Sequence, residues 1–324
     1  MELNNDRLIE MYRTMILIRK FESSVAEAFA AGKVPGFVHL GVGQEAVMAG
    51  VAYALEPQDW VSSTHREHGM LIARGADVGR ARAEIFGKLT GYCKGKGGSM
   101  HLAVFDKCCT GCNGILGPNQ TINNGVAFAL KYNKTNNIAV TMFGDGAAHR
   151  GEFHEAMNLA AIWKLPVVFF CVNNQYAISV PSKYAASVED IAARAGGYGV
   201  PGLVVDGNDV MAVHEAVTQA AKRARAGEGP SLIEAKTMRH RGHFEGDPQP
   251  YRTPEEMEEV MRQDPIPRFE RNLIENGILT QKQSEAVWDS AEAELQAAIR
   301  FTDESPYPPL EEALTDLYYT EALR

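Results

Sequence analysis

The chain has 324 residues, 45% of them hydrophobic, which is enough for one large domain or two closely packed ones. Its formal net charge is −9 and its basic residues do not cluster, which argues against a nucleic-acid partner. No apolar run has the length of a membrane span, the polar N-terminus MELNNDRLIE does not resemble a signal peptide, and the five cysteines lack the spacing of a disulfide framework. We therefore expect a cytoplasmic protein with reduced cysteines.

The first predicted element is a long helix over residues 5–31, capped by Asn5 or Asp6. Because it precedes the predicted sheet, we expect it to pack outside the core or on another subunit. An apolar helix that ends at Leu55 follows a glycine-rich stretch. Within that stretch, residues 41–46 have the form Gly-x-Gly-x-x-Ala of a dinucleotide fingerprint, but the strand before them would be very short and no clear βαβ unit follows. Nicotinamide binding is therefore disfavoured.

A polar cluster follows a short predicted strand near residue 60 and opens another helix. In this cluster Arg66 has the planar donor geometry that binds phosphate, and His65 or His68 can donate beside it. A solvated helix start explains the same residues equally well. His39 stands alone before a glycine turn, where a structural role is the more common one.

Two glycine-rich stretches come next. Residues 91–101, GYCKGKGGSMH, form a predicted loop that lacks the residue order of a nucleoside-triphosphate loop. Residues 108–117, CCTGCNGILG, are predicted to be turn-rich and contain Cys109-x-x-Cys112. Because no second cysteine pair exists, a metal or redox role is disfavoured. Residues 119–131 have the pattern of a helix.

The most informative stretch runs from residue 138 to residue 176. Two apolar runs, 138–143 and 167–172, flank a helical pattern over 152–163, which predicts a βαβ unit in a buried parallel sheet. A right-handed crossover places the carboxyl ends of both strands at one edge, where such sheets bind ligands. Asp145 and Asn174 follow these strands, so we expect them side by side.

Asp145 and Asn174 offer the oxygen ligands that Mg²⁺ prefers, and this ion usually shares its coordination with a phosphate. Gly146 allows a diphosphate to approach the backbone, and the following helix supplies free N–H groups. Either polar residue alone is also typical of a turn.

The rest of the chain continues the α/β pattern. We predict a polar loop that enters a helix over 181–195, strands over 203–205 and 231–238, a helix over 210–226, and a charged loop over 239–247 that contacts ligand or is simply exposed. From Pro254 to about Arg300 the pattern is helical, and the tail SPYPPLEEALTDLYY is expected to extend onto a neighbouring surface.

The sequence Gly144-Asp145-Gly146, 26 residues and then Asn173-Asn174 resembles the thiamine diphosphate motif with its usual spacing. The stretches GFVHLGVGQEA, STHREHG, GKGGSMH, GCNGILG, VNNQYAI and GHFEGDPQPYR stand in the order found in the α subunits of the thiamine diphosphate-dependent first component of 2-oxo acid and acetoin dehydrogenase complexes. The resemblance covers nearly the whole chain. It implies the thiamine diphosphate-binding fold, an α/β domain over 36–250 with a central parallel sheet flanked by helices. An N-terminal helical arm over 1–35 and C-terminal helices and tail over 251–324 would complete the chain.

The resemblance also implies the ligands and the partners. Thiamine diphosphate and Mg²⁺ would bind at the boundary with a β subunit, in an α2β2 heterotetramer that delivers its product to a lipoyl acyltransferase. The metal ligands would be Asp145, Asn174 and the carbonyl of Tyr176. Cofactor contacts would come from His65, Arg66, Gly114, Leu116, Asp145, Gly146, Ala147, Asn174, Tyr176, Ile178 and His243, and the catalytic residues would be His39 and His243.

The implied reaction is cleavage of the C–C bond next to a carbonyl, with transfer of the hydroxyethyl or acetyl unit. Acetoin is favoured as substrate because PGFVHL, STHR and GHFEGD resemble the acetoin subunits most, and pyruvate or a branched-chain 2-oxo acid is the alternative. The chain departs from its relatives at residues 118–124 and 147–150 and at Cys108, Cys109 and Cys112. These departures lie near the expected site and bear on the identity of the substrate.

Overall fold

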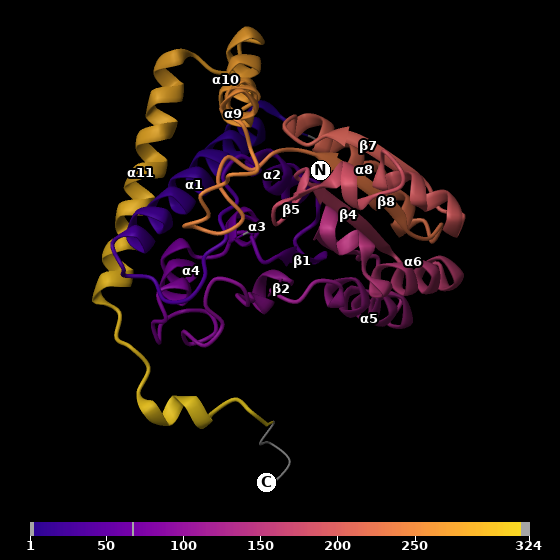
Figure 1. Cartoon of the computed structure of the whole chain (residues 1–324), viewed down its shortest axis with the longest axis horizontal. Helices are drawn as coiled ribbons and strands as arrows, with labels where there is room; N and C mark the ends of the chain where they lie inside the picture. The colour runs from indigo at the N-terminus through magenta and orange to yellow at the C-terminus, as the bar shows by residue number, and fades with distance from the viewer. Residues whose placement is uncertain (1–2, 67, 319–324) are drawn as a thin grey trace.

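A computed structural model describes residues 3–66 and 68–318 (Figure 1). Within this part of the chain, six strands form one parallel sheet in the order β2-β1-β3-β4-β8-β7. A two-stranded antiparallel hairpin, β5-β6, lies outside it. The strands are β1 (Trp60–Thr64), β2 (Cys109–Asn113), β3 (Ala139–Gly144), β4 (Val167–Asn173), β5 (Tyr176–Ala177), β6 (Val180–Pro181), β7 (Gly202–Asp206) and β8 (Ser231–Lys236).

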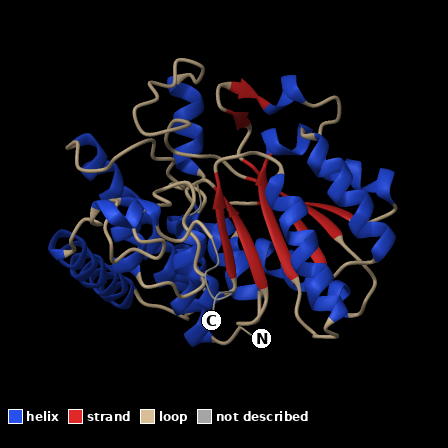
Figure 2. Ribbon diagram, turned by 90° about the horizontal axis from the view of Figure 1, so that it is seen from below, coloured by secondary structure: helices blue, strands red, loops and turns tan. Residues whose placement is uncertain are grey.

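Helices cover both sides of the sheet (Figure 2). The α-helices are α1 (Asn5–Ala30), α2 (Glu45–Ala54), α3 (His68–Ala73), α4 (Val78–Ile85), α5 (Pro118–Tyr132), α6 (Gly151–Trp163), α7 (Ser182–Ala185), α8 (Val210–Arg225), α9 (Pro254–Arg262), α10 (Pro265–Glu275) and α11 (Gln281–Glu304). The 3₁₀ segments are η1 (Phe105–Lys107), η2 (Asp145–His149), η3 (Ile191–Tyr198) and η4 (Leu310–Leu314). No described helix is long and apolar enough to cross a membrane.

Strand β4 shows why the sheet is buried on both faces. Val168, Phe170 and Val172 join the larger apolar cluster, together with side chains of α1, α2, α8 and α10. Phe169 and Cys171 point the other way, into a second cluster with α5, α6 and η3. Successive side chains of a strand face opposite sides, so an unbroken apolar run fits only a strand with cover on both faces. The predicted parallel sheet flanked by helices is confirmed.

Helix α1 has a more central place than we expected from its position before the sheet. Asn4 caps it by accepting a hydrogen bond from the Arg7 N–H, so the expected cap at residue 5 or 6 is wrong by one or two positions. The apolar stripe of α1 is buried against α2, α3, α10 and α11 of the same chain. The Tyr12 hydroxyl and the Ser284 hydroxyl lie 2.9 Å apart, which joins this helix to α11.

Two predicted irregular segments contain regular structure. The turn-rich prediction for 108–117 is wrong for β2, because its small and polar residues pair with β1 at the sheet edge. Pairing with a neighbouring strand can outweigh low strand propensity. The prediction of a loop over 181–195 misses the short helix α7, and the helical segment that follows is 3₁₀.

The C-terminal region is helical through α9, α10 and α11, as predicted. Beyond α11 the described chain extends away from the body of the molecule (Figure 1). Ion pairs hold its end near the glycine-rich loop: Lys94 and Lys96 each pair with both Glu312 and Asp316, at 2.8–3.6 Å. Residues 319–324 of the predicted tail lie outside the described residues.

Candidate active site

The strands β3 and β4 bring Asp145 and Asn174 to one edge of the sheet. These strands are parallel neighbours, and Gly144 pairs with Val172 near their carboxyl ends. Asp145 begins η2 directly after β3, and Asn174 follows the last residue of β4. The two polar side chains therefore leave adjacent strands in the same direction, as the βαβ pattern predicts.

A pocket of about 900 Å³, part of it open to solvent, lies at this edge. Ten of the twelve predicted site residues line it: His65, Arg66, Leu116, Asp145, Gly146, Ala147, Asn174, Tyr176, Ile178 and His243. Gly114 lies outside the lining although its neighbours Asn113 and Ile115 belong to it, and His39 lies behind the lining histidines.

Asp145 and Asn174 both carry oxygen atoms in buried positions. Asp145 is only 3% exposed, and burial raises the pKa of its carboxyl group to about 6 despite backbone hydrogen bonds and the nearby Arg239 and Arg66. The Asn174 amide donates to Gln44 Oε1 at 3.2 Å, but its own Oδ1 is buried and has no hydrogen-bond partner among the described residues. Both oxygen-bearing side chains line the same pocket.

Gly146 is shaped by the hairpin that follows β4. A Cβ atom at this position would lie 2.9 Å from the Cβ of Ala177. The backbone of η2 therefore passes too close to β5 for a larger residue. With no side chain at this position, the backbone of Gly146 itself lines the pocket.

Arg239 was not among the predicted site residues, yet it holds the loop that carries the predicted metal-ligand carbonyl. It is 1% exposed and donates to the carbonyl oxygen of Tyr176 at 3.1 Å and to that of Ile178 at 2.5 Å. It also donates to the Tyr251 hydroxyl at 2.8 Å. The sequence signal was a charged residue directly after an apolar strand, in a loop that we could not distinguish from an exposed one.

Tyr251 continues this network to His243. Its hydroxyl donates to Asp247 Oδ2 at 2.5 Å, and the same oxygen accepts the His243 backbone N–H at 2.7 Å. Arg239 thus connects the loop after β4 with the loop after β8 through partly buried hydrogen bonds. The charged loop over 239–247 is therefore held in place by hydrogen bonds and contributes His243 to the pocket wall.

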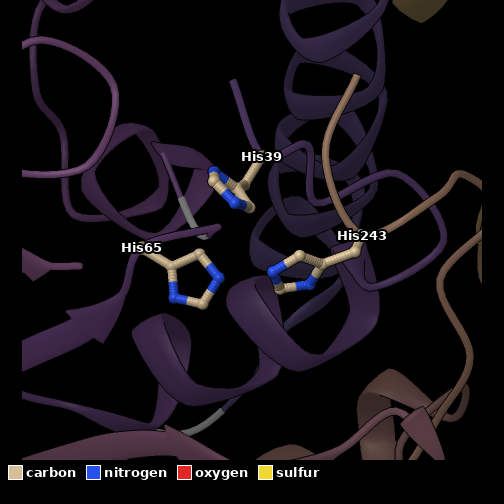
Figure 3. A group of neighbouring side chains, drawn as sticks. All are labelled: His39, His65 and His243. Atoms are coloured by element: carbon tan, nitrogen blue, oxygen red, sulfur yellow. The ribbon is translucent and has the colours of Figure 1, made fainter. Parts of the chain in front are cut away.

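Three imidazole rings converge beside the pocket (Figure 3). His39 comes from the loop before α2, His65 from the end of β1 and His243 from the loop after β8. The ring centre of His39 is 4.6 Å from that of His65 and 4.9 Å from that of His243. The family resemblance assigned all three residues to the cofactor and substrate site, but no residue pattern indicated that their rings meet.

Burial, with a further contribution from Arg66, determines the protonation of this cluster. Its guanidinium is buried, donates to the Leu40 carbonyl at 3.2 Å and lies 3.2 Å from His243 Nδ1. Arginine only donates, so Nδ1 of His243 must accept and its proton must be on Nε2. Burial and the Arg66 charge lower the pKa of His39 to about 3 and that of His243 to about 4. Burial and Arg66 also lower the pKa of His65 well below its usual value, so all three rings are neutral at pH 7.

Residues 118–124, where the chain differs from the usual family pattern, fall into two groups by position. Asn119 and Gln120 line the pocket, and Gln120 Nε2 is buried without a partner among the described residues. Asn123 and Asn124 point elsewhere, to the Ser62 hydroxyl and the Ala156 carbonyl, and fasten α5 to its neighbours. Of residues 147–150, only Ala147 lines the pocket.

The structure gives other roles to three features that the sequence analysis weighed as possible functional sites: the glycines of residues 41–46, His68 and Cys109. No strand directly precedes residues 41–46 within the described chain, and a Cβ on Gly43 would lie 2.6 Å from the Met238 carbonyl oxygen, so this glycine serves close packing. His68 is fully buried and bonds to Glu22 and Ser99 away from the pocket. Burial raises the pKa of the Cys109 thiol to about 12, which leaves it a weak nucleophile and ligand at neutral pH.

Comparison with known proteins identifies the family. The model of the dehydrogenase E1 component family matches residues 12–311. The chain is 46% identical to the α subunit of acetoin:2,6-dichlorophenolindophenol oxidoreductase from Bacillus subtilis (strain 168), across 98% of this chain and 95% of the relative. It is 41% identical to the protein of the same name from Cupriavidus necator, with the same coverage, and 36% identical to the pyruvate dehydrogenase E1 component α subunit of Rhizobium meliloti (strain 1021), across 98% and 91%. The chain therefore belongs to the dehydrogenase E1 component family of thiamine diphosphate-dependent oxidoreductases.

Proposed function

We propose that the chain is the α subunit of a dehydrogenase that cleaves acetoin at the C–C bond next to its carbonyl group. The hydroxyethyl or acetyl unit would pass to a lipoyl acyltransferase. The choice of acetoin follows from the 46% and 41% identity to two subunits of acetoin oxidoreductases. Pyruvate is the alternative substrate, motivated by the 36% identity to a pyruvate dehydrogenase subunit, and a branched-chain 2-oxo acid remains a third.

Mg²⁺ is proposed to bind to Asp145, Asn174 and the backbone carbonyl of Tyr176. The support is the buried carboxyl group of Asp145 beside the unpartnered Oδ1 of Asn174. Both are hard oxygen ligands of the kind that Mg²⁺ selects. Arg239 already donates to the Tyr176 carbonyl, which fixes its position and leaves its second lone pair for the metal.

The diphosphate is proposed to lie against Arg66, His65, Gly146 and Ala147. Arg66 offers a buried guanidinium at the pocket wall, and the bare backbone at Gly146 permits close approach of an anion. Gly114, Leu116 and Ile178 are assigned to the organic part of the cofactor. When bound, thiamine diphosphate supplies the electron sink that permits a C–C bond next to a carbonyl group to break.

His39 and His243 are proposed to act on the substrate. The Nε2–H of neutral His243 is a hydrogen-bond donor, since its Nδ1 faces Arg66. His39 is neutral and buried beside it, with Nδ1 unpartnered among the described residues, so it is available to bond to a substrate carbonyl or hydroxyl. The low pKa values mean that both rings are neutral at pH 7 and can orient substrate as hydrogen-bond donors or acceptors.

A β subunit is proposed to cover the pocket in an α2β2 heterotetramer. Apolar side chains stand exposed at the pocket: Ile115 is 65% exposed, Leu116 43% and Ile178 61%. Exposed apolar residues around a binding pocket are typical of a surface that another chain covers. Because all five cysteines are free thiols, a reducing cytoplasm is the proposed location.

The test is to produce the chain together with its β subunit and to add Mg²⁺, thiamine diphosphate and an artificial electron acceptor. We expect kcat/KM for acetoin to exceed that for pyruvate and for branched-chain 2-oxo acids. Preference for a 2-oxo acid would overturn the substrate while leaving the cofactor site intact.

The cofactor site has its own test. Asp145→Ala should abolish Mg²⁺-dependent binding of thiamine diphosphate, measured by titration calorimetry. Asp289→Ala changes an exposed aspartate on α11 and serves as the control, with binding expected to be unchanged. Binding by Asp145→Ala as tight as by the control would refute the metal assignment.

A further inference from the structure

We infer that Glu234 and Asn173 are positioning residues, which hold the loop after β4 in the shape that binds a divalent cation. In the proposed function, on which this inference rests, Asn174 and the Tyr176 carbonyl are ligands of Mg²⁺. Of the two adjacent asparagines, Asn174 lines the pocket, whereas Asn173 and Glu234 are not among the described lining residues. Their contribution is therefore indirect, through the shape of the loop.

Glu234 is a buried acid in β8, the strand beside β4. It is 0% exposed and pairs in register with Cys171 of β4. Asn173 lies two residues further along β4, on the same face of the sheet, because successive side chains of a strand alternate between its faces. Asn173 Nδ2 donates to Glu234 Oε1 at 2.7 Å, and the backbone N–H of Ala192 in η3 donates to Oε2 at 2.8 Å. Both carboxylate oxygens are thus used within the fold.

Glu234 determines which way the Asn173 amide faces. An ionised carboxylate only accepts hydrogen bonds, so the amide turns its NH₂ group toward Glu234 and its Oδ1 toward the loop. In this orientation Oδ1 accepts the backbone N–H of Gln175 at 3.0 Å, and the Gln175 side chain donates back to the Asn173 carbonyl at 3.3 Å. The carboxylate therefore selects the amide orientation that closes the start of the loop.

The loop needs this support because its backbone is unusual. Gln175 has a φ of +70° and Ile178 a φ of +57°. Residues other than glycine rarely adopt this left-handed conformation, and it is rarest for β-branched residues such as isoleucine. Arg239 holds the far end of the loop through the Ile178 carbonyl, whereas Glu234 holds its start through Asn173. The two proposed ligands in the loop lie between these anchors, so their relative position depends on both.

Two substitutions exchange donor and acceptor within this pair at nearly constant size. Glu234→Gln leaves one accepting oxygen for two donors, and Asn173→Asp places two carboxylates against each other. In the double variant the new amide at position 234 donates to the new carboxylate at position 173 and still accepts the Ala192 N–H. That carboxylate still accepts the Gln175 N–H. Each single change should therefore loosen the loop, and the double change should restore it.

The test is calorimetric titration of the full chain, in complex with its β subunit, with Mg²⁺ at a fixed excess of thiamine diphosphate. Each single variant should weaken Mg²⁺ binding about 10- to 100-fold, the usual cost of losing a group that orients a metal ligand, and the double variant should return to within about threefold of the unaltered chain. Asp59→Asn is the matched control. Asp59 is also 0% exposed and accepts the backbone N–H groups of Glu56 and Ile138, but it precedes β1 at the opposite edge of the sheet. It should lower the melting temperature of the cofactor-free complex, as Glu234→Gln does, and leave the Mg²⁺ affinity unchanged.

Asn173→Ser remains informative if a variant with altered charge does not fold. Its hydroxyl still accepts the Gln175 N–H but is too short to reach Glu234, so Mg²⁺ binding should again fall at least about tenfold. Affinity equal to that of the control in either single variant or in Asn173→Ser would overturn the proposal, and so would a double variant as weak as the single ones. If Asp145→Ala abolishes binding while these variants bind normally, only the positioning role is refuted. Binding retained by Asp145→Ala would instead refute the metal assignment itself.

Discussion

Replacement of Arg239 tests whether the two loops of the pocket depend on one buried side chain. Arg239→Met keeps most of the side-chain volume but removes the donors that bond to the Tyr176 and Ile178 carbonyls and to the Tyr251 hydroxyl. Arg239→Lys keeps the charge, but one ammonium group cannot match the geometry of the guanidinium fork. The two variants therefore separate the charge from the geometry.

The expected effect follows from the number of bonds lost. A hydrogen bond from a charged donor contributes roughly 1.5–3 kcal/mol, so loss of three removes at least about 4 kcal/mol before water replaces part of it. Suppose that the net loss, after water has replaced part of the hydrogen bonding, is about 3 kcal/mol. The loops are then less ordered in the cofactor-free protein, and part of the free energy of cofactor binding, about 3 kcal/mol, is used to order them. At about 1.4 kcal/mol per factor of ten, affinity for Mg²⁺ and thiamine diphosphate should fall about 100-fold in Arg239→Met, and about tenfold in Arg239→Lys.

Titration calorimetry of the α–β complex measures this affinity, and limited proteolysis of the cofactor-free complex measures the order of residues 239–252. Arg241→Met is the control, because Arg241 belongs to the same loop but is only half-buried and pairs with Glu245 alone in the described contacts. Cofactor affinity of Arg239→Met within about threefold of the control, with equal resistance to protease, would refute the reasoning.

Three further changes test other parts of the fold. Glu84→Gln should lower the free energy of unfolding by about 2–4 kcal/mol in urea, because the buried carboxylate accepts four backbone N–H groups from residues 93–98 and an amide cannot accept on both sides. Gly43→Ala should lower the melting temperature, since φ is +96° and the new Cβ would meet backbone; an unchanged melting temperature would contradict the close packing. Burial alone would raise the pKa of Asp264, but hydrogen bonds and charge from Arg19 outweigh it and lower that pKa. The stabilisation is therefore present above the ordinary pKa of about 3.9 and is lost as pH falls through the lowered value, so Arg19→Met should flatten the decline in stability below about pH 4. Equal slopes in denaturation series across this range would contradict the ion pair.

The βαβ unit around Asp145 and Asn174 could be predicted because its signals are local. Two unbroken apolar runs around a helical pattern require strands with cover on both faces, and the crossover rule then places the residues after both strands at one edge. The strand β2 could not be found in this way. Its residues have weak strand propensity, and only pairing with β1 makes them a strand.

The sequence by itself determined the parallel sheet and the edge of it at which Asp145 and Asn174 meet, because each depends on periodicity and short spacings along the chain. The tertiary structure decided the rest. It placed His39 from before α2 beside His65 and His243, and it turned Arg239 inward to hold two loops at once. These contacts join residues up to about 200 positions apart in the sequence. The protonation of His39 and His243 depends on burial and on the Arg66 charge, and no local sequence pattern encodes either.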